Sequence, residues 1–353
     1  MDAFGAVGRA CLSPGAGRWP AAVAIAGLAV ALGGCAAPDE LPAPAAVEVV
    51  QADGGYLFRE SGSPVLFYQL EPTSRDGEYR RSNYVHPLHG LDGEILTEDF
   101  PDDHPHHRGV YWTWHQVLVG EVRAGDPWLA RRFSWELAGA EVLDGRGGLR
   151  VTHRWHSPDF ASGALPIAEE TAEVVAHPAS GDVRLVDFDI RLSSLQPDVK
   201  VGGSEDDKGY GGFSVRVRML DALEFTAAGG PVRPDRVAMS VGDWVDFSGT
   251  FPPRNEPSGV AVFVHPDSAG HPQSWILRSA ETPSMQNPVW PGREPAALPG
   301  DGQAVRLKYR LAVHRGLASA VDLARLYREY AGDRRAQATR GLASELLRPA
   351  LPR

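Results

Sequence analysis

The segment QAVRLKYRLAVHRG, residues 303–316, alternates apolar and polar side chains with a period of two residues. Successive side chains of a β-strand point to opposite faces, so this pattern predicts a strand that is apolar on one face only. The apolar face would carry Val305, Leu307, Tyr309, Leu311 and Val313, and the polar face Arg306, Lys308, Arg310 and His314. Such a strand belongs in an antiparallel sheet with one face on a core and the other in water.

More strands of this kind follow one another between Gly, Pro, Asp and Ser turns. They span residues 147–157, 182–194, 211–220 and 259–266. We find no internal repeat and no alternation of strands with helices, and only residues 318–332 have helical periodicity. The sequence therefore predicts an all-β fold, a large antiparallel β-sandwich of the supersandwich or jelly-roll type, with a short C-terminal helix.

The N-terminal 34 residues have the layout of a bacterial lipoprotein signal peptide. Two arginines precede the apolar run AAVAIAGLAVAL, which is too short to span a bilayer, and LGGC then ends at Cys35. Because small residues before a cysteine resemble the lipobox, we expect Cys35 to be lipidated; an ordinary signal peptide is the alternative. We predict a signal peptide over residues 1–34, a flexible tether over 35–50, a single β-sandwich domain over 51–335 and a C-terminal tail over 336–353.

Composition limits the partners and the compartment. The formal net charge of −10 argues against nucleic acid and anionic lipid as partners. With no later apolar run of about 18 residues, lipid would be the only membrane attachment, so we expect an exported, lipid-anchored protein of the bacterial cell envelope. Cys11 and Cys35 are the only cysteines, which leaves no thiol for catalysis, disulfides or zinc binding after processing.

Half of the chain's 12 histidines lie close together, around the sequence EDFPDDHPHHRG at residues 98–109. If this stretch is extended, His104 and His106 share one face and His107 takes the other. The density of imidazoles and acids predicts a site, although density by itself does not define a reaction.

Three hypotheses remain open for this segment. A metal site would use His104, His106 and His86 as ligands of a divalent metal, which is the one cofactor the segment indicates. A metal-free site would use a histidine as acid or base, with Arg108 holding an oxyanion or a carboxylate. In the third, the histidines bond turn carbonyls and the acids are only solvated. Glu98 is a candidate by proximity, as is Asp99.

Two further segments offer groups for substrate binding. The Gly-rich turn EDDKGYGGFSVRVR lacks the phosphate-binding motif and supplies Lys208, Tyr210 and Arg216; a hairpin with solvated arginines is the alternative. The loops HPDSAGHPQSW and MQNPVWPG supply His271, Trp275 and Asn287. Such residues suit a sugar, which stacks on rings and bonds through its hydroxyls, but they are also ordinary loop residues.

Several of these strings, in the same order over about residues 55–330, resemble a bacterial family of unknown function. They are YVHPLHGLDGEILTEDFPDDHPHHRGVYW, KGYGGFSVR, WVDFSG, GVAVFVHP with HPQSW, and YRLAVHRG. That family is commonly labelled methane oxygenase (PmoA)-like. Its members resemble exported proteins found beside sugar dehydrogenases and glycoside-degrading functions, so the resemblance implies a carbohydrate substrate.

The resemblance also implies a site, residue by residue. The centre would comprise His86, Glu98, Asp99, His104, His106, His107 and Arg108, and a second wall would comprise Lys208, Tyr210, Gly211, Gly212 and Arg216. The sequence departs from the family pattern once. Where Trp-His-Val-Arg is expected, it has Trp275-Ile276-Leu277-Arg278, so one histidine is missing.

Taken together, the sequence predicts an envelope-anchored lipoprotein that acts on a sugar or glycoside as a hydrolase or lyase with a His-rich site. A carbohydrate-binding lipoprotein without catalysis is the first alternative. A metal-dependent oxygenase, as the family label says, is the second. An enzyme needs histidines within hydrogen-bonding reach of one cavity, whereas a binding module needs aromatic platforms with polar rims.

Overall fold

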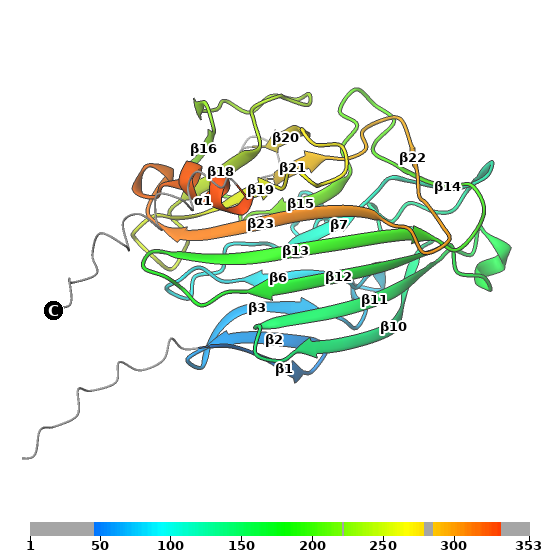
Figure 1. Cartoon of the computed structure of the whole chain (residues 1–353), viewed down its shortest axis with the longest axis horizontal. Helices are drawn as coiled ribbons and strands as arrows, with labels where there is room; N and C mark the ends of the chain where they lie inside the picture. Colours follow the sequence, from blue (N-terminus) through cyan, green and yellow to red (C-terminus); the bar gives the residue numbers. More distant parts are fainter. Residues whose placement is uncertain (1–45, 221, 279–284, 333–353) are drawn as a thin grey trace, which may run out of the picture. The chain divides into compact units, whose positions relative to one another are not determined.

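The computed structural model describes residues 46–220, 222–278 and 285–332. The predicted signal peptide, Cys35 and the C-terminal tail lie outside the described residues. The described chain consists mostly of antiparallel strands in two large sheets and two small ones, which confirms the all-β prediction (Figure 1). None of its helices is long and apolar enough to cross a membrane.

The first large sheet has eight strands in the order β1-β2-β3-β6-β7-β15-β21-β20. Their bounds are β1 Val47–Ala52, β2 Gly55–Glu60, β3 Ser63–Gln69, β6 Tyr84–Leu88, β7 Val110–Thr113, β15 Gly212–Arg216, β20 Ser274–Arg278 and β21 Met285–Val289. The predicted tether ends earlier than residue 50. Because β1 pairs with β2 over its whole length, the residues from Val47 onward belong to the sheet.

The second large sheet has nine strands in the order β10-β11-β12-β13-β23-β19-β18-β16-β17. Their bounds are β10 Ser134–Leu143, β11 Gly148–His156, β12 Ala168–Ala176, β13 Val183–Ser194, β16 Leu223–Ala227, β17 Gly230–Pro231, β18 Trp244–Gly249, β19 Ser258–Val264 and β23 Val305–Arg315. The small sheets contain β22 Ala296–Ala297, β14 Val199–Gly202, β8 Gln116–Val119 and β9 Val122–Arg123, and β4 Thr73–Arg75 and β5 Glu78–Arg81. Two 3-10 turns, η1 Ala161–Gly163 and η2 Ala318–Ala320, and the helix α1 Leu323–Tyr330 complete the described elements.

The two large sheets pack face to face through aromatic side chains. Phe213 of β15 stacks on Tyr309 of β23 at a ring-centroid distance of 4.3 Å, and it meets Phe188 of β13 at 5.2 Å. Trp112 of β7 lies 6.0 Å from Phe188. Burying each such ring stabilises the fold by about 2–3 kcal/mol. The side chains of the predicted apolar face of β23 belong to this core between the sheets.

The predicted polar face of β23 is not polar and exposed along its whole length, because its end at His314 is buried. Lys308 and Arg310 keep polar surroundings, but His314 is fully buried and its Nε2 lies 2.8 Å from Oδ1 of Asp246 on β18. A second apolar cluster covers this outer face of the sheet, and α1 contributes Leu323 to it. The helix is shorter than predicted, because residues 318–320 form a 3-10 turn instead.

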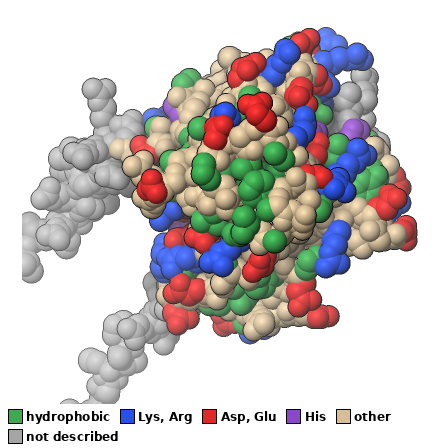
Figure 2. All heavy atoms as spheres, turned by 90° about the vertical axis from the view of Figure 1, so that its right-hand side faces the viewer, with side chains coloured by type: hydrophobic (Ala, Val, Ile, Leu, Met, Phe, Trp, Pro, Cys, Tyr) green, Lys and Arg blue, Asp and Glu red, His purple; other side chains and the backbone are tan. Residues whose placement is uncertain are grey.

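The outer face of the eight-stranded sheet carries the residues of interest. Alternation along β15 points Phe213 into the core and Arg216 away from it, and along β7 it points Tyr111 away from the core. Trp128, from the loop before β10, packs 5.3 Å from the Tyr111 ring on that side. Viewed from the side that carries β14 and β22, basic and acidic side chains are interspersed around hydrophobic atoms (Figure 2).

Candidate active site

The His-rich segment is a loop laid over the outer face of the eight-stranded sheet, not an extended strand. A turn through Pro105 and His106 lets the backbone N–H of His107 donate to the carbonyl of His104 at 2.8 Å. The three imidazoles therefore gather, with ring centroids 5.5 Å apart for His104 and His106, 4.9 Å for His104 and His107, and 4.6 Å for His106 and His107. The predicted separation onto two faces is wrong because a turn cancels strand alternation.

Arg216 of β15 ties this loop to the sheet. Its side chain is fully buried, and it donates to Glu98 through Nε at 3.0 Å and Nη2 at 2.8 Å. It also donates to Asp103 through Nη1 at 3.2 Å and Nη2 at 2.8 Å. Bidentate charge-assisted pairs of this kind fix geometry firmly. Arg216 and Glu98 therefore hold the loop, and both also line a neighbouring pocket of about 590 Å³.

The start of the loop is held by Asp99. Its carboxylate accepts hydrogen bonds from the buried Arg81 and, at 2.7 Å, from the hydroxyl of Tyr84. The guanidinium of Arg81 also lies over the ring of Phe100 at 3.2 Å from the centroid. Asp99 therefore holds the scaffold. It also lines the neighbouring pocket of about 590 Å³, and its catalytic role stays a prediction.

Arg108 does not face a cavity. It is 1% exposed, and its guanidinium lies 4.9 Å from the Tyr111 ring centroid and 5.5 Å from that of Trp135. Burial lowers its pKa to about 10. The predicted role of holding an anionic group is therefore not supported, because the side chain points into the protein between the two aromatic rings.

A pocket of about 400 Å³ opens beside the imidazoles. It is lined by His104, His106, His107, Leu129, Lys208, Tyr210, Arg236, Arg278 and Met285. The structure thus brings three predicted histidines of one segment together with Lys208 and Tyr210 of the Gly-rich turn, more than 100 residues later in the sequence. Gly209 has a φ of +59° and its Cβ position lies 2.8 Å from the backbone nitrogen of Arg293, so only glycine suits this turn.

Hydrogen bonding fixes the tautomer of His104. Its Nδ1 lies 3.1 Å from Oδ2 of Asp103, and because a carboxylate only accepts, Nδ1 must donate. The partial burial of Asp103 raises its pKa, but the hydrogen bonds and charge of Arg216 outweigh this effect and the pKa is lowered. Asp103 is therefore ionised at neutral pH, and the neutral form of His104 carries its lone pair on Nε2.

The two neighbouring imidazoles are neutral. Burial, followed by the charge of His104, lowers the pKa of His106 to about 3. Burial also lowers the pKa of His107 well below its ordinary value. Nδ1 of His107 faces a guanidinium nitrogen of Arg216 at 3.4 Å, and because that nitrogen only donates, Nε2 carries the proton of His107. Burial raises the pKa of Tyr210, so its phenol stays protonated at neutral pH.

His86 lies apart from the other predicted metal ligands. Its Nδ1 bonds the hydroxyl of Thr97 at 3.0 Å, and it lines a separate pocket of about 590 Å³ together with Asp102 and Arg218. Among the described residues, no group of three or more His, Cys, Asp or Glu side chains is placed to hold a metal ion. The proposed ligand set of His86, His104 and His106 is therefore not assembled here.

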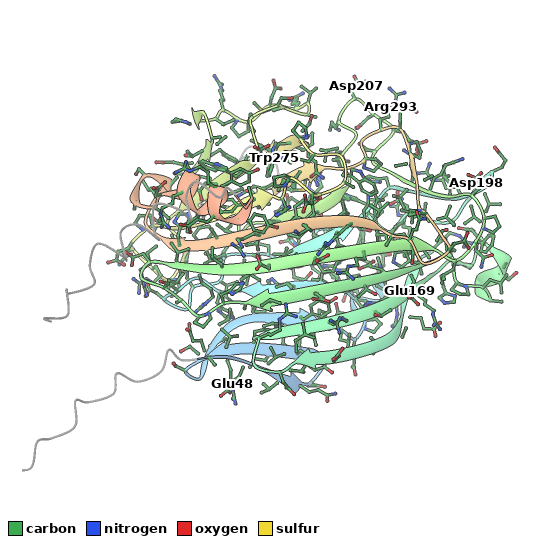
Figure 3. All side chains as sticks on the ribbon, viewed as in Figure 1. Glu48, Glu169, Asp198, Asp207, Trp275 and Arg293 are labelled. Atoms are coloured by element: carbon green, nitrogen blue, oxygen red, sulfur yellow. The ribbon has the colours of Figure 1, made fainter. Side chains whose placement is uncertain are left out.

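The three sugar-binding candidates from the later loops do not line this pocket. Trp275 is fully buried on the core side of β20, and its Nε1 donates to the carbonyl of Gly242 at 2.7 Å (Figure 3). Asn287 is also fully buried and donates to the carbonyl of Phe213 at 2.6 Å. Nε2 of His271 lies 3.0 Å from Oδ1 of Asp243. Trp275 and Asn287 belong to strands rather than loops, so the predicted stacking and hydroxyl contacts are wrong for them.

Sequence reasoning missed four lining residues. Leu129 and Arg236 occupy segments without any motif. Met285 begins the segment MQNPVWPG, from which only Asn287 was selected, and Arg278 is separated from the histidines by about 170 residues. Ile276 stands where the family resemblance implies a histidine. It is fully buried in an apolar cluster with Met285 beneath the pocket, so this position fills space here.

The fold and site define an all-β protein with a polar, histidine-lined pocket on the outer face of one sheet. The sequence matches DUF6807, a family of unknown function, over residues 57–328, and the chain belongs to this family. The family description names no activity, so the methane-oxygenase label is not shown. No curated protein matches the sequence.

Distant likenesses exist among solved structures. One is the GH36 α-galactosidase AgaA of Geobacillus stearothermophilus in complex with raffinose, at 10% identity and a TM-score of 0.30 over 76% of this chain and 41% of that one. The α-galactosidase of Lactobacillus brevis is 9% identical, with a TM-score of 0.30 over 77% of this chain and 38% of that one. The 4-α-glucanotransferase of Thermococcus litoralis is 9% identical, with a TM-score of 0.23 over 78% of this chain and 38% of that one. This chain spans less than half the length of each, and scores this low do not extend to function.

Proposed function

We propose that this protein is an acid–base enzyme that acts on a sugar or glycoside in the three-histidine pocket. The observation that carries the proposal is the pair of Asp103 and His104. An ionised carboxylate, itself held by Arg216, orients an imidazole whose Nε2 keeps its lone pair, at the edge of a pocket that also holds a protonated phenol. An imidazole nitrogen that can accept a proton and a phenol that can donate one, beside one cavity, are the minimum for proton-transfer catalysis.

The lining supports a sugar as the ligand. Leu129 and Met285 offer apolar surface, and the ring of Tyr210 lies beside them. Imidazole, ammonium and guanidinium groups supply hydrogen bonds from the same walls. This combination of apolar patches and converging polar groups is what a sugar, with its apolar ring faces and its hydroxyls, requires. A cavity of about 400 Å³ is in the size range of small-molecule sites.

A divalent metal fits this pocket poorly. Nδ1 of His104 is occupied by Asp103, and Nδ1 of His107 faces the guanidinium of Arg216. Lys208 adds a further positive charge to the lining, which disfavours a dication. A metal-dependent oxygenase is therefore not the function we propose.

A carbohydrate-binding protein without catalysis is the second candidate. Binding modules present aromatic platforms to the sugar, and Tyr210 is the one Phe, Tyr or Trp side chain among the residues lining the pocket. An imidazole oriented by Asp103, beside a phenol in the same lining, is the arrangement that proton transfer needs. The arrangement therefore favours the enzyme.

The test is turnover of a panel of glycosides by the folded protein and by matched variants. His104→Ala is expected to lower turnover by about 10²–10⁴-fold, and Asp103→Asn to lower it and change its pH profile. His177→Ala is the control, because this half-exposed histidine pairs with Asp187 on the other large sheet. Binding of glycosides without turnover, unaffected by His104→Ala, would favour the binding module. No binding and no turnover with any glycoside would refute both candidates.

A further inference from the structure

The charge of the pocket lining distinguishes among sugars. Lys208, Arg236 and Arg278 are among the nine described residues that line it, and none of the nine is Asp or Glu. The nearby carboxylate of Asp206 pairs with Lys208 at 2.7 Å but lines a neighbouring pocket instead. The cationic groups thus reach the cavity while the acid beside them does not.

The guanidinium of Arg278 is held by backbone carbonyls rather than by a carboxylate. Nη1 of Arg278 donates to the backbone carbonyl of Asp235 at 3.1 Å, and Nη2 donates to the carbonyl of Arg236 at 3.2 Å. Both printed side-chain bonds of Arg278 thus go to backbone carbonyls. Carbonyl bonds orient the guanidinium of Arg278 and leave its full charge in place. Asp206 and Asp235 act on this charge from outside the lining. The described lining itself presents three cations and no carboxylate to the cavity, a combination that favours an anionic ligand.

The same lining argues against hydrolysis. Glycoside hydrolases of the usual kind place two carboxyl groups on either side of the bond they break. The described residues offer no such pair in this pocket. A neutral imidazole, a protonated phenol and several cations are present instead, and these are the groups that an elimination reaction uses.

We infer that the substrate is a sugar acid, a glycoside whose ring carries a carboxylate at C5, and that the reaction is β-elimination. This inference rests on the proposed function. Lys208, Arg236 and Arg278 would neutralise the carboxylate, which acidifies the hydrogen on the neighbouring carbon and stabilises the carbanion formed there. The pocket therefore belongs to a lyase that acts on uronate residues.

Atoms and electrons balance without a co-reactant. Nε2 of His104 takes the proton from C5, and the electron pair of that C–H bond forms a C4=C5 double bond. The C4–O glycosidic bond breaks as its electrons pass to the leaving oxygen, which takes the proton of the Tyr210 hydroxyl. The phenolate of Tyr210 then recovers a proton from the imidazolium of His104 through solvent. No water is consumed and no oxidant is needed.

Binding of matched sugars tests the substrate class. Calorimetry would compare galacturonate and glucuronate with galactose and glucose, which differ only in a hydroxymethyl group in place of the carboxylate. We expect the uronates to bind about tenfold or more tightly. Arg236→Gln and Arg278→Gln should each remove most of this preference and weaken the binding of the neutral sugars much less, because glutamine keeps hydrogen-bond donors but not the charge. Arg236 is exposed, so its replacement spares the core. Arg59→Gln is the control, because this exposed arginine pairs with Glu48 in the same sheet.

Turnover of uronate oligomers tests the reaction. Oligomers of galacturonate, glucuronate and mannuronate would be incubated with the protein, and the ultraviolet absorbance of the new C4=C5 double bond would be followed. Its appearance, and its loss in Tyr210→Phe, supports the inference. Release of reducing sugar from neutral glycosides, with uronates inert, overturns it but leaves the proposed function standing. Tighter binding of glucose 6-phosphate than of any uronate also overturns it. If no sugar binds or is turned over, both this inference and the proposed function are overturned.

Discussion

The buried pair of Asp246 and His314 gives the sharpest test of the fold's electrostatics. Both side chains are fully buried. Nε2 of His314 lies 2.8 Å from the Asp246 carboxylate and Nδ1 lies 3.2 Å from the carbonyl of Arg315. Because both neighbours only accept, both ring nitrogens must donate, and the ring is an imidazolium. Burial alone lowers the pKa of His314, but Asp246 outweighs it and the pKa is raised above its ordinary value.

Asp246→Asn removes the charge and keeps the shape. In the variant His314 is expected to be neutral, so at pH 7 the loss is that of a charge-assisted hydrogen bond, about 1.5–3 kcal/mol of unfolding free energy. At pH 5 the unfolded histidine, with a pKa of about 6.5, binds a proton that the folded variant cannot. The gap of about 1.5 units between pH 5 and the pKa of the unfolded histidine adds about 2 kcal/mol to the loss of unfolding free energy.

The sign of the pH dependence follows from the raised pKa. In the wild type the stability contributed by the folded imidazolium is fully present below about pH 6.5 and is lost as pH rises through the folded pKa. The deficit of Asp246→Asn is therefore greatest at pH 5, about 4 kcal/mol, and shrinks toward pH 8. Urea denaturation followed by tryptophan fluorescence at pH 5, 6, 7 and 8 measures it.

A matched variant separates charge from packing. Ser248 donates to the same carboxylate, so Ser248→Ala is expected to cost about 1 kcal/mol at every pH. A deficit of Asp246→Asn that is equal at pH 5 and pH 8, or larger at pH 8, would refute the reasoning.

Three further predictions concern the site and the N-terminus. Arg216→Met leaves the carboxylates of Glu98 and Asp103 unpaired. Because these side chains are 24% and 33% exposed, we expect urea denaturation to show a loss of about 2–3 kcal/mol of unfolding free energy rather than the full cost of a buried pair. An unchanged denaturation midpoint would show that other contacts hold the loop. Elemental analysis of the purified protein and of its His104→Ala variant is expected to find the same metal content, and stoichiometric metal lost only in the variant would contradict our placement of the imidazoles. Cys35→Ala is expected to move the protein from the membrane fraction to the soluble envelope fraction, and wild-type protein that fractionates as soluble would contradict the lipid anchor.

Local patterns predicted five strands, β11, β13, β15, β19 and β23, but not the others. The period-two alternation of residues 305–313 predicted which side chains share a face, because successive Cβ atoms of a strand always point to opposite sides. The helix near the C-terminus was predicted from its helical periodicity. It begins later than that periodicity indicated, because Asp322 caps it: the side chain of Asp322 accepts from the backbone N–H of Arg325 at 2.9 Å.

Alternation does not say which face is the core or what covers the other. Trp275 has the residue type of a sugar platform, yet β20 turns it into the sandwich, and His314 lies on the predicted polar face but beneath a second apolar cluster. Both outcomes depend on elements distant in the sequence that pack on these strands. No local pattern records that packing.

The sequence by itself determined an antiparallel β fold, and it marked the histidine segment and the Gly-rich turn as places of interest. Only the tertiary structure decided that His104, His106 and His107 face one pocket, through a turn at Pro105 that alternation did not predict. It also separated His86 from them and brought Arg278 to the same cavity. The physical reason is that side-chain direction follows from local backbone geometry, whereas a pocket and its charge arise where segments far apart in the chain converge.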